Sequence, residues 1–181
     1  EATDYWQDVA LTANWKHIAR TNEAGRKRAY SAFMVMHYWQ ALARTGQPRD
    51  VARLIPRILE VDHSYLVESE QLVAFRILAL CFTRQGPPDE AQRQATLKWL
   101  EPLYPNPSPR VNQMLVELPV YLRSPQVIAK TVPLLRAATA SEDLLLYPFY
   151  LRYARDGWTP DGNCVLFRSM LGQFISRDPA L

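Results

Sequence analysis

The sequence predicts an all-α fold, in which about nine helices form antiparallel pairs and stack into a right-handed α-solenoid. Apolar residues recur at steps of three and four through most of the chain, which is the spacing of an amphipathic helix. The chain has 14 prolines but only 6 glycines, whereas a β-sandwich normally needs many glycine-rich turns. Short connections between the helical segments place successive helices side by side and antiparallel.

The composition predicts one globular domain that covers residues 1–181. Hydrophobic residues make up 48% of the chain and charged residues 22%, so it can bury a core of ordinary size. We find no signal peptide and no run of the length of a membrane span. Because the sequence begins at Glu1 rather than at methionine, we expect it to be a fragment of a larger chain.

The first two predicted helices are rich in aromatic residues. The first covers residues 3–20, and the second opens at Asn22 and runs to residue 42. The sequence Thr45-Gly46-Gln47-Pro48 ends the second helix, since a glycine followed by a proline is a common C-terminal signal. The apolar residues of the first helix are Tyr5, Trp6, Val9, Leu11, Trp15 and Ile18.

Seven further helices follow, separated by short breakers. They are predicted at residues 49–61, 66–84, 89–103, 109–123, 125–138, 141–155 and 159–175. Ser108, Ser124 and Ser141 are expected to be N-caps, and the first two precede a proline. Successive pairs begin about 35–40 residues apart, which is the period of helical-hairpin repeats. An irregular helical bundle is the alternative arrangement.

Five prolines fall inside the predicted helices. An interior proline costs about 3 kcal/mol in an isolated helix, so packing must compensate for each one. Kinked helices in curved stacks tolerate such residues. The five are Pro56, Pro102, Pro119, Pro133 and Pro148.

Two segments resemble the helices of a HEAT repeat. Residues 53–62, Arg-Leu-Ile-Pro-Arg-Ile-Leu-Glu-Val-Asp, match the first helix of such a repeat, and residues 72–80, Leu-Val-Ala-Phe-Arg-Ile-Leu-Ala-Leu, match the second. In that family an aspartate commonly closes the first helix and an arginine enters the second. Asp62 and Arg76 occupy these places, so the resemblance implies a HEAT-like solenoid.

A longer resemblance covers residues 76–174 and rests on the order of short segments that end in Gly157-Trp158-Thr159. The segments are residues 82–88, 100–105, 111–116, 120–125, 130–135, 151–152 and 157–159. Their order is similar to the helical part of large extracytoplasmic proteins from planctomycete-type bacteria, which join a propeller-like region to HEAT-like helices and a c-type haem domain. The resemblance implies a periplasmic or otherwise extracytoplasmic multidomain protein, with a cytoplasmic location as the alternative. The haem-attachment signature Cys-x-x-Cys-His is absent from this sequence, so we expect no cofactor in this segment.

Arg49, Arg53 and Arg57 are candidate partner-binding residues, because a spacing of four places them on one helix face. Such a stripe could bind an acidic partner or phosphates. The alternative is a solvated face whose arginines pair locally with Asp50 and Glu60. The net charge of the chain is only +3, which is small for a protein whose main ligand is nucleic acid.

Trp6, Trp15 and Trp39 are the second set of candidate partner-binding residues. Aromatic side chains on a concave face can stack on bases or sugars. The alternative is that these residues fill the seams between packed helices.

The sequence contains no recognisable catalytic or metal-binding motif. It lacks the nucleophile elbow, the HExxH pair and the glycine-rich phosphate loop. His17, His37 and His63 lie too far apart to form a helical metal site. Cys81 lies in an apolar run and is expected to be buried, and a bridge to Cys164 stays open.

These observations predict a non-catalytic protein-interaction or scaffold module. Its partner would be a neighbouring domain of the parent chain or a separate protein, and it would bind through an exposed apolar or aromatic stripe. The alternative is a nucleic-acid-binding HEAT-like solenoid, similar to DNA glycosylases, in which tryptophan, arginine and a carboxylate line one face. The salt dependence of DNA binding separates the two functions.

Overall fold

A computed structural model describes residues 25–63 and 66–160 of the chain. Helices make up 74% of these residues, and no strand occurs among them. The predicted all-α class is therefore confirmed. The described part holds fewer helices than the roughly nine predicted for the whole chain, since the helix predicted at 3–20 and nearly all of the one at 159–175 lie outside it.

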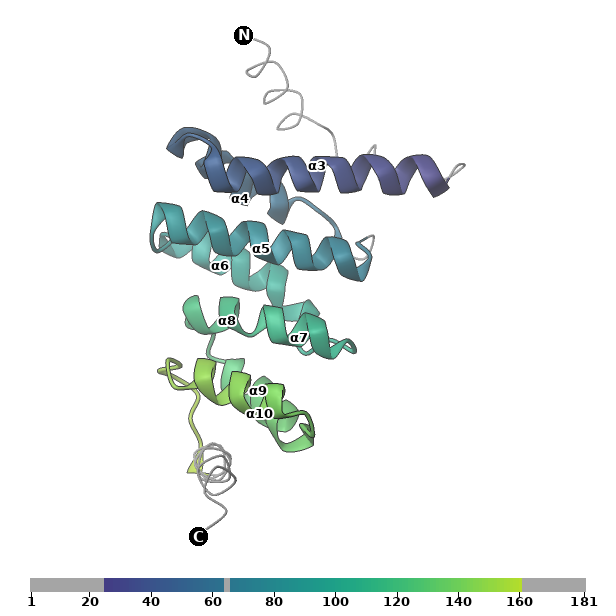
Figure 1. Cartoon of the computed structure of the whole chain (residues 1–181). Coiled ribbons are helices and arrows are strands. Elements are labelled where there is room, and N and C mark those ends of the chain that lie inside the picture. Colours follow the sequence, from purple (N-terminus) through teal and green to yellow (C-terminus); the bar gives the residue numbers. More distant parts are fainter. Residues whose placement is uncertain (1–24, 64–65, 161–181) are drawn as a thin grey trace, which may run out of the picture. The chain divides into compact units, whose positions relative to one another are not determined.

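The chain divides into two compact units, Glu1–Ala95 and Thr96–Leu181. In the described part of the first unit, α3 (Gly25–Thr45), α4 (Pro48–Leu59) and α5 (Glu68–Gln85) pack against one another (Figure 1). The side chains at the centre of this packing are fully buried apolar residues from all three helices. They are Met36, Trp39, Leu54, Ile55, Ile58, Phe75, Ile77 and Leu78.

Arg84 connects the ends of α3 and α5. Its guanidinium, near the C-terminus of α5, donates hydrogen bonds to the carbonyl oxygens of Ala43 and Gly46 at 3.0 and 2.7 Å. The C-terminal ends of the two helices are therefore neighbours, so α3 and α5 run in the same direction, with α4 between them in sequence. These carbonyls lie at the C-terminal end of a helix, where backbone carbonyl oxygens lack N–H donors and attract a cation.

The second unit begins within α6 (Glu90–Leu100), which is followed by the 3₁₀ turn η2 (Glu101–Leu103). Next come α7 (Pro109–Leu115), α8 (Glu117–Tyr121), α9 (Val127–Ala137) and α10 (Ser141–Leu151). Helix α10 packs against α7, α8 and α9 (Figure 1). The core of this unit includes Leu100, Val111, Leu115, Val116, Leu122, Val127, Ile128, Tyr147 and Leu151.

The five prolines behave in two different ways. Pro56, Pro133 and Pro148 lie inside α4, α9 and α10, as predicted. Pro102 and Pro119 instead accompany interruptions, because a proline nitrogen cannot donate the hydrogen bond that continues a helix. The predicted helix 89–103 therefore ends as a 3₁₀ turn that contains Pro102. The predicted helix 109–123 is divided into α7 and α8 just before Pro119.

Buried and partly buried hydrogen bonds hold the segment between α6 and α7. Asn112, which is buried, accepts from the backbone nitrogen of Asn106 at 2.6 Å and donates to the carbonyl of Asn106 at 2.7 Å. The hydroxyl of Tyr104 lies 2.6 Å from that of Thr131 on α9. These contacts satisfy polar groups that would be costly to bury alone, and they fix the helices on which α10 rests.

Candidate functional site

The most prominent exposed apolar feature of the described residues is one side of α10 and the turn that follows it. Leu145, Phe149 and Tyr153 are spaced four apart, so they lie on one side of the helix. Their residues are 52%, 49% and 57% exposed. Together with Arg152, which contacts two of them, they form what we call the α10 face.

The opposite side of α10 anchors the helix in the second unit. Tyr147, Pro148 and Leu151 are buried in the core. At the flanks, Gln113 of α7 donates to the carboxylate of Asp143 at 2.8 Å, and the hydroxyl of Tyr150 donates to Glu117 of α8 at 3.3 Å. Because these core contacts fix the rotation of α10 about its own axis, the α10 face stays on the outside of the second unit.

Arg152 orders the rings of the α10 face. The central carbon of its guanidinium lies 4.2 Å from the centre of the Phe149 ring and 4.6 Å from that of Tyr153. The guanidinium also donates to the hydroxyl of Tyr153. The rings of Phe149 and Tyr153 meet edge to face, with centres 6.1 Å apart. Cation–π contacts at exposed sites are worth about 0.5–1 kcal/mol each, so these contacts partly order the side chains of the α10 face.

Two tyrosines of α10 have raised pKa values. Burial raises the pKa of Tyr147 to about 12, and the nearby charge of Asp143 adds to the effect. Burial also raises the pKa of Tyr150, and Glu117 contributes as a negative neighbour and hydrogen-bond partner. Both phenols therefore remain protonated at neutral pH and can act as hydrogen-bond donors.

The α10 face has the chemistry of a protein-binding surface. Aromatic residues and arginine are enriched at the energetic centres of protein interfaces, where they become desolvated. Full burial of a large apolar side chain contributes about 1.5–3 kcal/mol. Sequence analysis did not single out these residues, although it did predict that an interaction module would carry an exposed apolar or aromatic stripe.

The three candidate arginines lie on the outer side of α4. Arg49 and Arg53 are exposed and Arg57 is half-buried, while Val51, Leu54, Ile55 and Ile58 turn into the core. Arg57 forms an ion pair with Glu60 at 3.0 Å, and Arg49 lies 3.8 Å from the buried carboxylate of Asp50. Asp50 and Glu60, the local ion-pair partners expected of a solvated face, are thus both present. Binding of another molecule by these arginines stays a prediction.

Of the candidate tryptophans, the structure describes only Trp39. Its side chain is completely buried between the helices of the first unit, as the packing alternative expects. Trp39 and the exposed arginines of α4 therefore do not line a common surface, as the nucleic-acid alternative would need. Trp6 and Trp15 lie outside the described residues.

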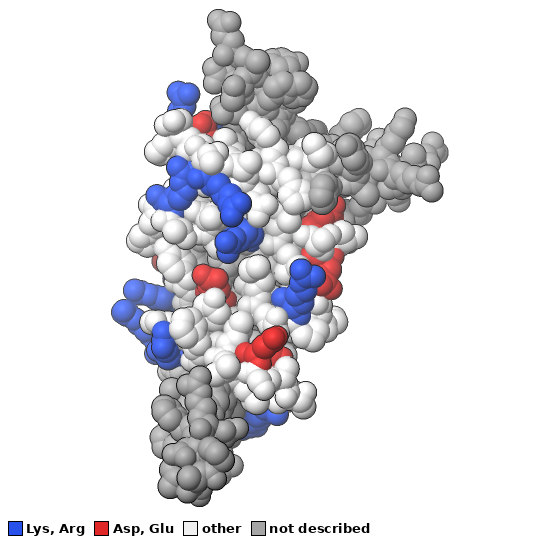
Figure 2. Space-filling model, in the orientation of Figure 1, with Lys and Arg blue, Asp and Glu red and all other residues white. Residues whose placement is uncertain are grey.

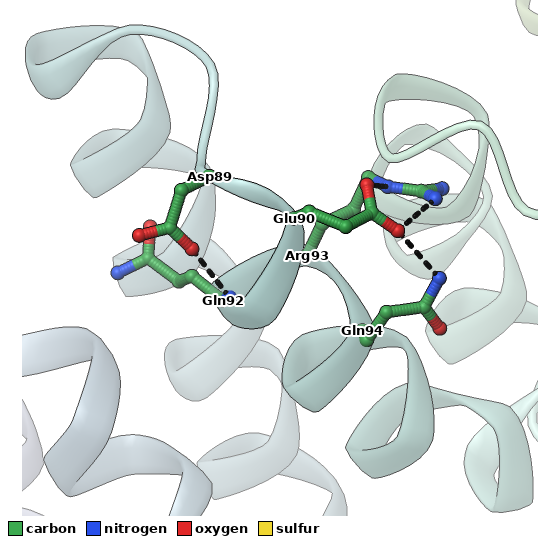
Figure 3. Close-up of polar contacts among 5 residues, drawn as sticks. All are labelled: Asp89, Glu90, Gln92, Arg93 and Gln94. Carbon is green, nitrogen blue, oxygen red and sulfur yellow. Dashed lines mark hydrogen bonds and ion pairs between the residues drawn. The ribbon is translucent and has the colours of Figure 1, made fainter.

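The N-terminus of α6 carries a cluster of polar side chains (Figure 3). Glu90 accepts two hydrogen bonds from Arg93, at 2.9 and 2.6 Å, and one from Gln94 at 2.9 Å. These bonds lower the pKa of Glu90 to about 2. Asp89 accepts from the backbone nitrogen of Gln92 at 2.7 Å, as an N-cap does. All these partners lie within one turn of each other, so the cluster stabilises the start of the helix.

Charged side chains of both signs occur on the face drawn in Figure 2. In Figure 2, Lys and Arg side chains on the visible face occur in small groups, with uncharged residues and carboxylates close to them. No group of three or more His, Cys, Asp and Glu side chains within residues 25–63 and 66–160 could hold a metal ion. No helix in these same ranges is long and apolar enough to cross a membrane.

The prediction that Cys81 is buried is confirmed. Cys81 is free and fully buried in α5, and its thiol lies 3.9 Å from the carbonyl oxygen of Val51. Burial raises the pKa of this thiol to about 12, which Arg84 partly offsets. The thiol is therefore protonated and unreactive at neutral pH. Cys164 lies outside the described residues.

Comparison with known proteins returned no relative: no protein-family model, no curated protein and no solved structure matches this chain.

Proposed function

We propose that this chain is a protein-interaction module that binds a partner protein through the α10 face. The observation that carries the proposal is an exposed row of large apolar side chains, ordered by a stacked arginine, on a helix whose other side is fixed in a core. The free energy of the system falls when a partner removes exposed apolar groups from water.

We also propose that the helices continue as a HEAT-like α-solenoid. The parallel course of α3 and α5, which are joined through α4 in the sequence, is the arrangement expected when helical hairpins stack. Such a stack would present the α10 face on a rigid support. The resemblance of residues 76–174 to extracytoplasmic multidomain proteins favours a periplasmic or otherwise extracytoplasmic setting, where neighbouring domains of a longer chain would be available as partners.

Site-specific photo-crosslinking tests the proposed surface. A benzoylphenylalanine at position 145 reports on the α10 face, and the same group at Met34 is the matched control. Met34 is also a large apolar residue, 51% exposed, but it belongs to α3 of the other unit. We expect protein adducts from position 145 that are absent or much weaker from position 34. Equal labelling at both positions, or none at position 145, would contradict the proposal.

The nucleic-acid alternative is tested with the same protein. Filter binding of DNA and RNA at low salt is expected to show only weak binding, because the net charge of the chain is only +3. A steep loss of tight binding with added salt would instead support a nucleic-acid partner.

A further inference from the structure

We infer that the partner of the α10 face is a second copy of this chain, and that two α10 helices pair antiparallel about a two-fold axis. The inference rests on the proposed function and names the partner for that same surface. A two-fold contact uses one surface twice, so the surface must be complementary to itself. The arrangement of four residues on α10 meets this requirement.

The four residues are Glu142, Leu145, Phe149 and Arg152, and they are separated by three, four and three positions. These steps place all four on one side of the helix and its last turn. The spacing reads the same in both directions, whereas the chemistry changes from acidic, through two apolar residues, to basic. Glu142 and Arg152 are exposed, as Leu145 and Phe149 are.

Antiparallel pairing therefore brings unlike ends together. When Phe149 packs against Leu145 of the second copy, Glu142 comes opposite Arg152 of that copy, and the two-fold axis repeats both contacts. A parallel pairing would bring Glu142 against Glu142 and Arg152 against Arg152, which costs free energy through like-charge repulsion. Antiparallel helices also place the positive end of one helix dipole beside the negative end of the other.

The observed contacts of Arg152 are compatible with this role. Its guanidinium lies over Phe149 and Tyr153 and donates to the Tyr153 hydroxyl. An arginine has five N–H donors in one plane, so others remain for a carboxylate of the second copy. Stacking holds the cation at the edge of the apolar residues, where an ion pair is partly shielded from water.

Sedimentation equilibrium of the full chain tests the inference. The chain has a mass of 20.9 kDa, and we expect a species of twice that mass to form at concentrations on the order of micromolar, the weak end of the range for interfaces of ordinary size. Phe149→Glu places two carboxylates near the axis and is expected to weaken the dimer by roughly 30-fold or more. Met34→Glu, at an equally exposed apolar position, is the matched control and should leave the dimer intact.

Exchanging the charges of Glu142 and Arg152 tests the antiparallel direction. Both residues are exposed, so these substitutions do not disturb the core. Glu142→Arg and Arg152→Glu should each weaken the dimer roughly 5–10-fold, and the protein with both changes should regain most of that loss. Circular dichroism confirms that each variant is folded. A double variant weaker than either single one would overturn the antiparallel pairing.

The outcomes separate this inference from the proposed function. A wild-type chain that stays monomeric at every concentration, or a dimer that Phe149→Glu leaves unchanged, overturns self-association. If position 145 still crosslinks to a different protein, the interaction function survives and only its partner is wrong. If position 145 gives no adduct either, both fail.

Discussion

Two glycines of the chain have nearly the same φ angle but very different surroundings. Gly86 and Gly157 have φ values of 84° and 83°, a region that side chains with a Cβ atom rarely adopt. Gly86 ends α5 and has open space around the position of a Cβ atom. At Gly157 a Cβ atom would lie 2.6 Å from the carbonyl oxygen of Pro125. The segment after α10 is thus closely packed on the start of α9.

Replacing each glycine by alanine separates the two effects. Gly86→Ala measures backbone strain alone and is expected to cost about 1 kcal/mol or somewhat more. Gly157→Ala must also displace a backbone carbonyl, so we expect it to cost about 2 kcal/mol beyond Gly86→Ala. Urea unfolding of both variants and the wild-type chain measures the difference. A loss at Gly157 no greater than that at Gly86 would show that the chain relaxes around Pro125 without cost.

Single residues show clearly where sequence reasoning succeeds. Cys81 was predicted to be buried because apolar residues surround it in sequence, and it is. The position of Trp39 was left open between a core and a binding surface, since an aromatic residue suits both. Its helix buries Trp39 because α4 and α5 cover that side, which only the tertiary packing decides.

Most helices could be predicted from the sequence because their start and stop signals are local. Ser108 caps α7 through its side chain, as its place before Pro109 predicts. The interruptions at Pro102 and Pro119 were missed, whereas Pro56, Pro133 and Pro148 are accommodated. The sequence alone does not show which prolines gain enough packing to offset the lost hydrogen bond.

The α10 face was missed for a different reason. Residues 144–151, Leu-Leu-Leu-Tyr-Pro-Phe-Tyr-Leu, are all apolar or aromatic apart from one proline, so no polar side marks the outer surface of the helix. Burial of Tyr147 and Leu151 leaves Leu145 and Phe149 outside. An apolar run longer than one stripe indicates an extra contact surface, but the side that faces outward is set by α7, α8 and α9.

Arg84 acts at the level of whole helices, since it links the C-terminus of α5 to that of α3. Arg84→Gln is expected to lower the free energy of unfolding by about 1–2 kcal/mol, because the two carbonyls lose charged hydrogen-bond donors. Arg76→Gln, an exposed arginine on the same helix, is the matched control and should change stability by less than about 0.5 kcal/mol. Denaturant titrations followed by circular dichroism make the comparison; equal losses would mean that Arg84 contributes no more than a surface charge.

On the scale of the whole molecule, the described chain forms two compact units. The length and composition of the chain predicted one domain, and the number of domains stays a prediction. The boundary between the units falls inside α6, so no proline- or glycine-rich segment marks it. The continuity of a helix across the boundary explains why composition gives no sign of it.

Both units contain groups whose pKa is raised by burial, and this predicts how the whole chain responds to alkaline pH. The first unit contains Cys81, with a pKa of about 12. The second contains Tyr147, also at about 12, and Tyr104, whose pKa is raised by burial although its hydrogen bond to Thr131 opposes the shift. The ordinary values are 9.0 for the thiol and 10.0 for the phenol.

A raised pKa in the folded state means that the unfolded chain releases its proton first as the pH rises. The stabilisation from these groups is therefore complete below their ordinary pKa values and is lost as the pH rises from about 9 toward 12. We expect the free energy of unfolding to fall across this window in the wild-type chain. Tyr147→Phe removes one of the titrating groups, so its stability should fall less steeply, even if it is lower at neutral pH. Urea unfolding at a series of pH values, with tyrosine absorbance to report ionisation, measures both slopes. Identical slopes would mean that Tyr147 ionises in the folded chain as readily as in the unfolded one, and that its burial does not limit alkaline stability.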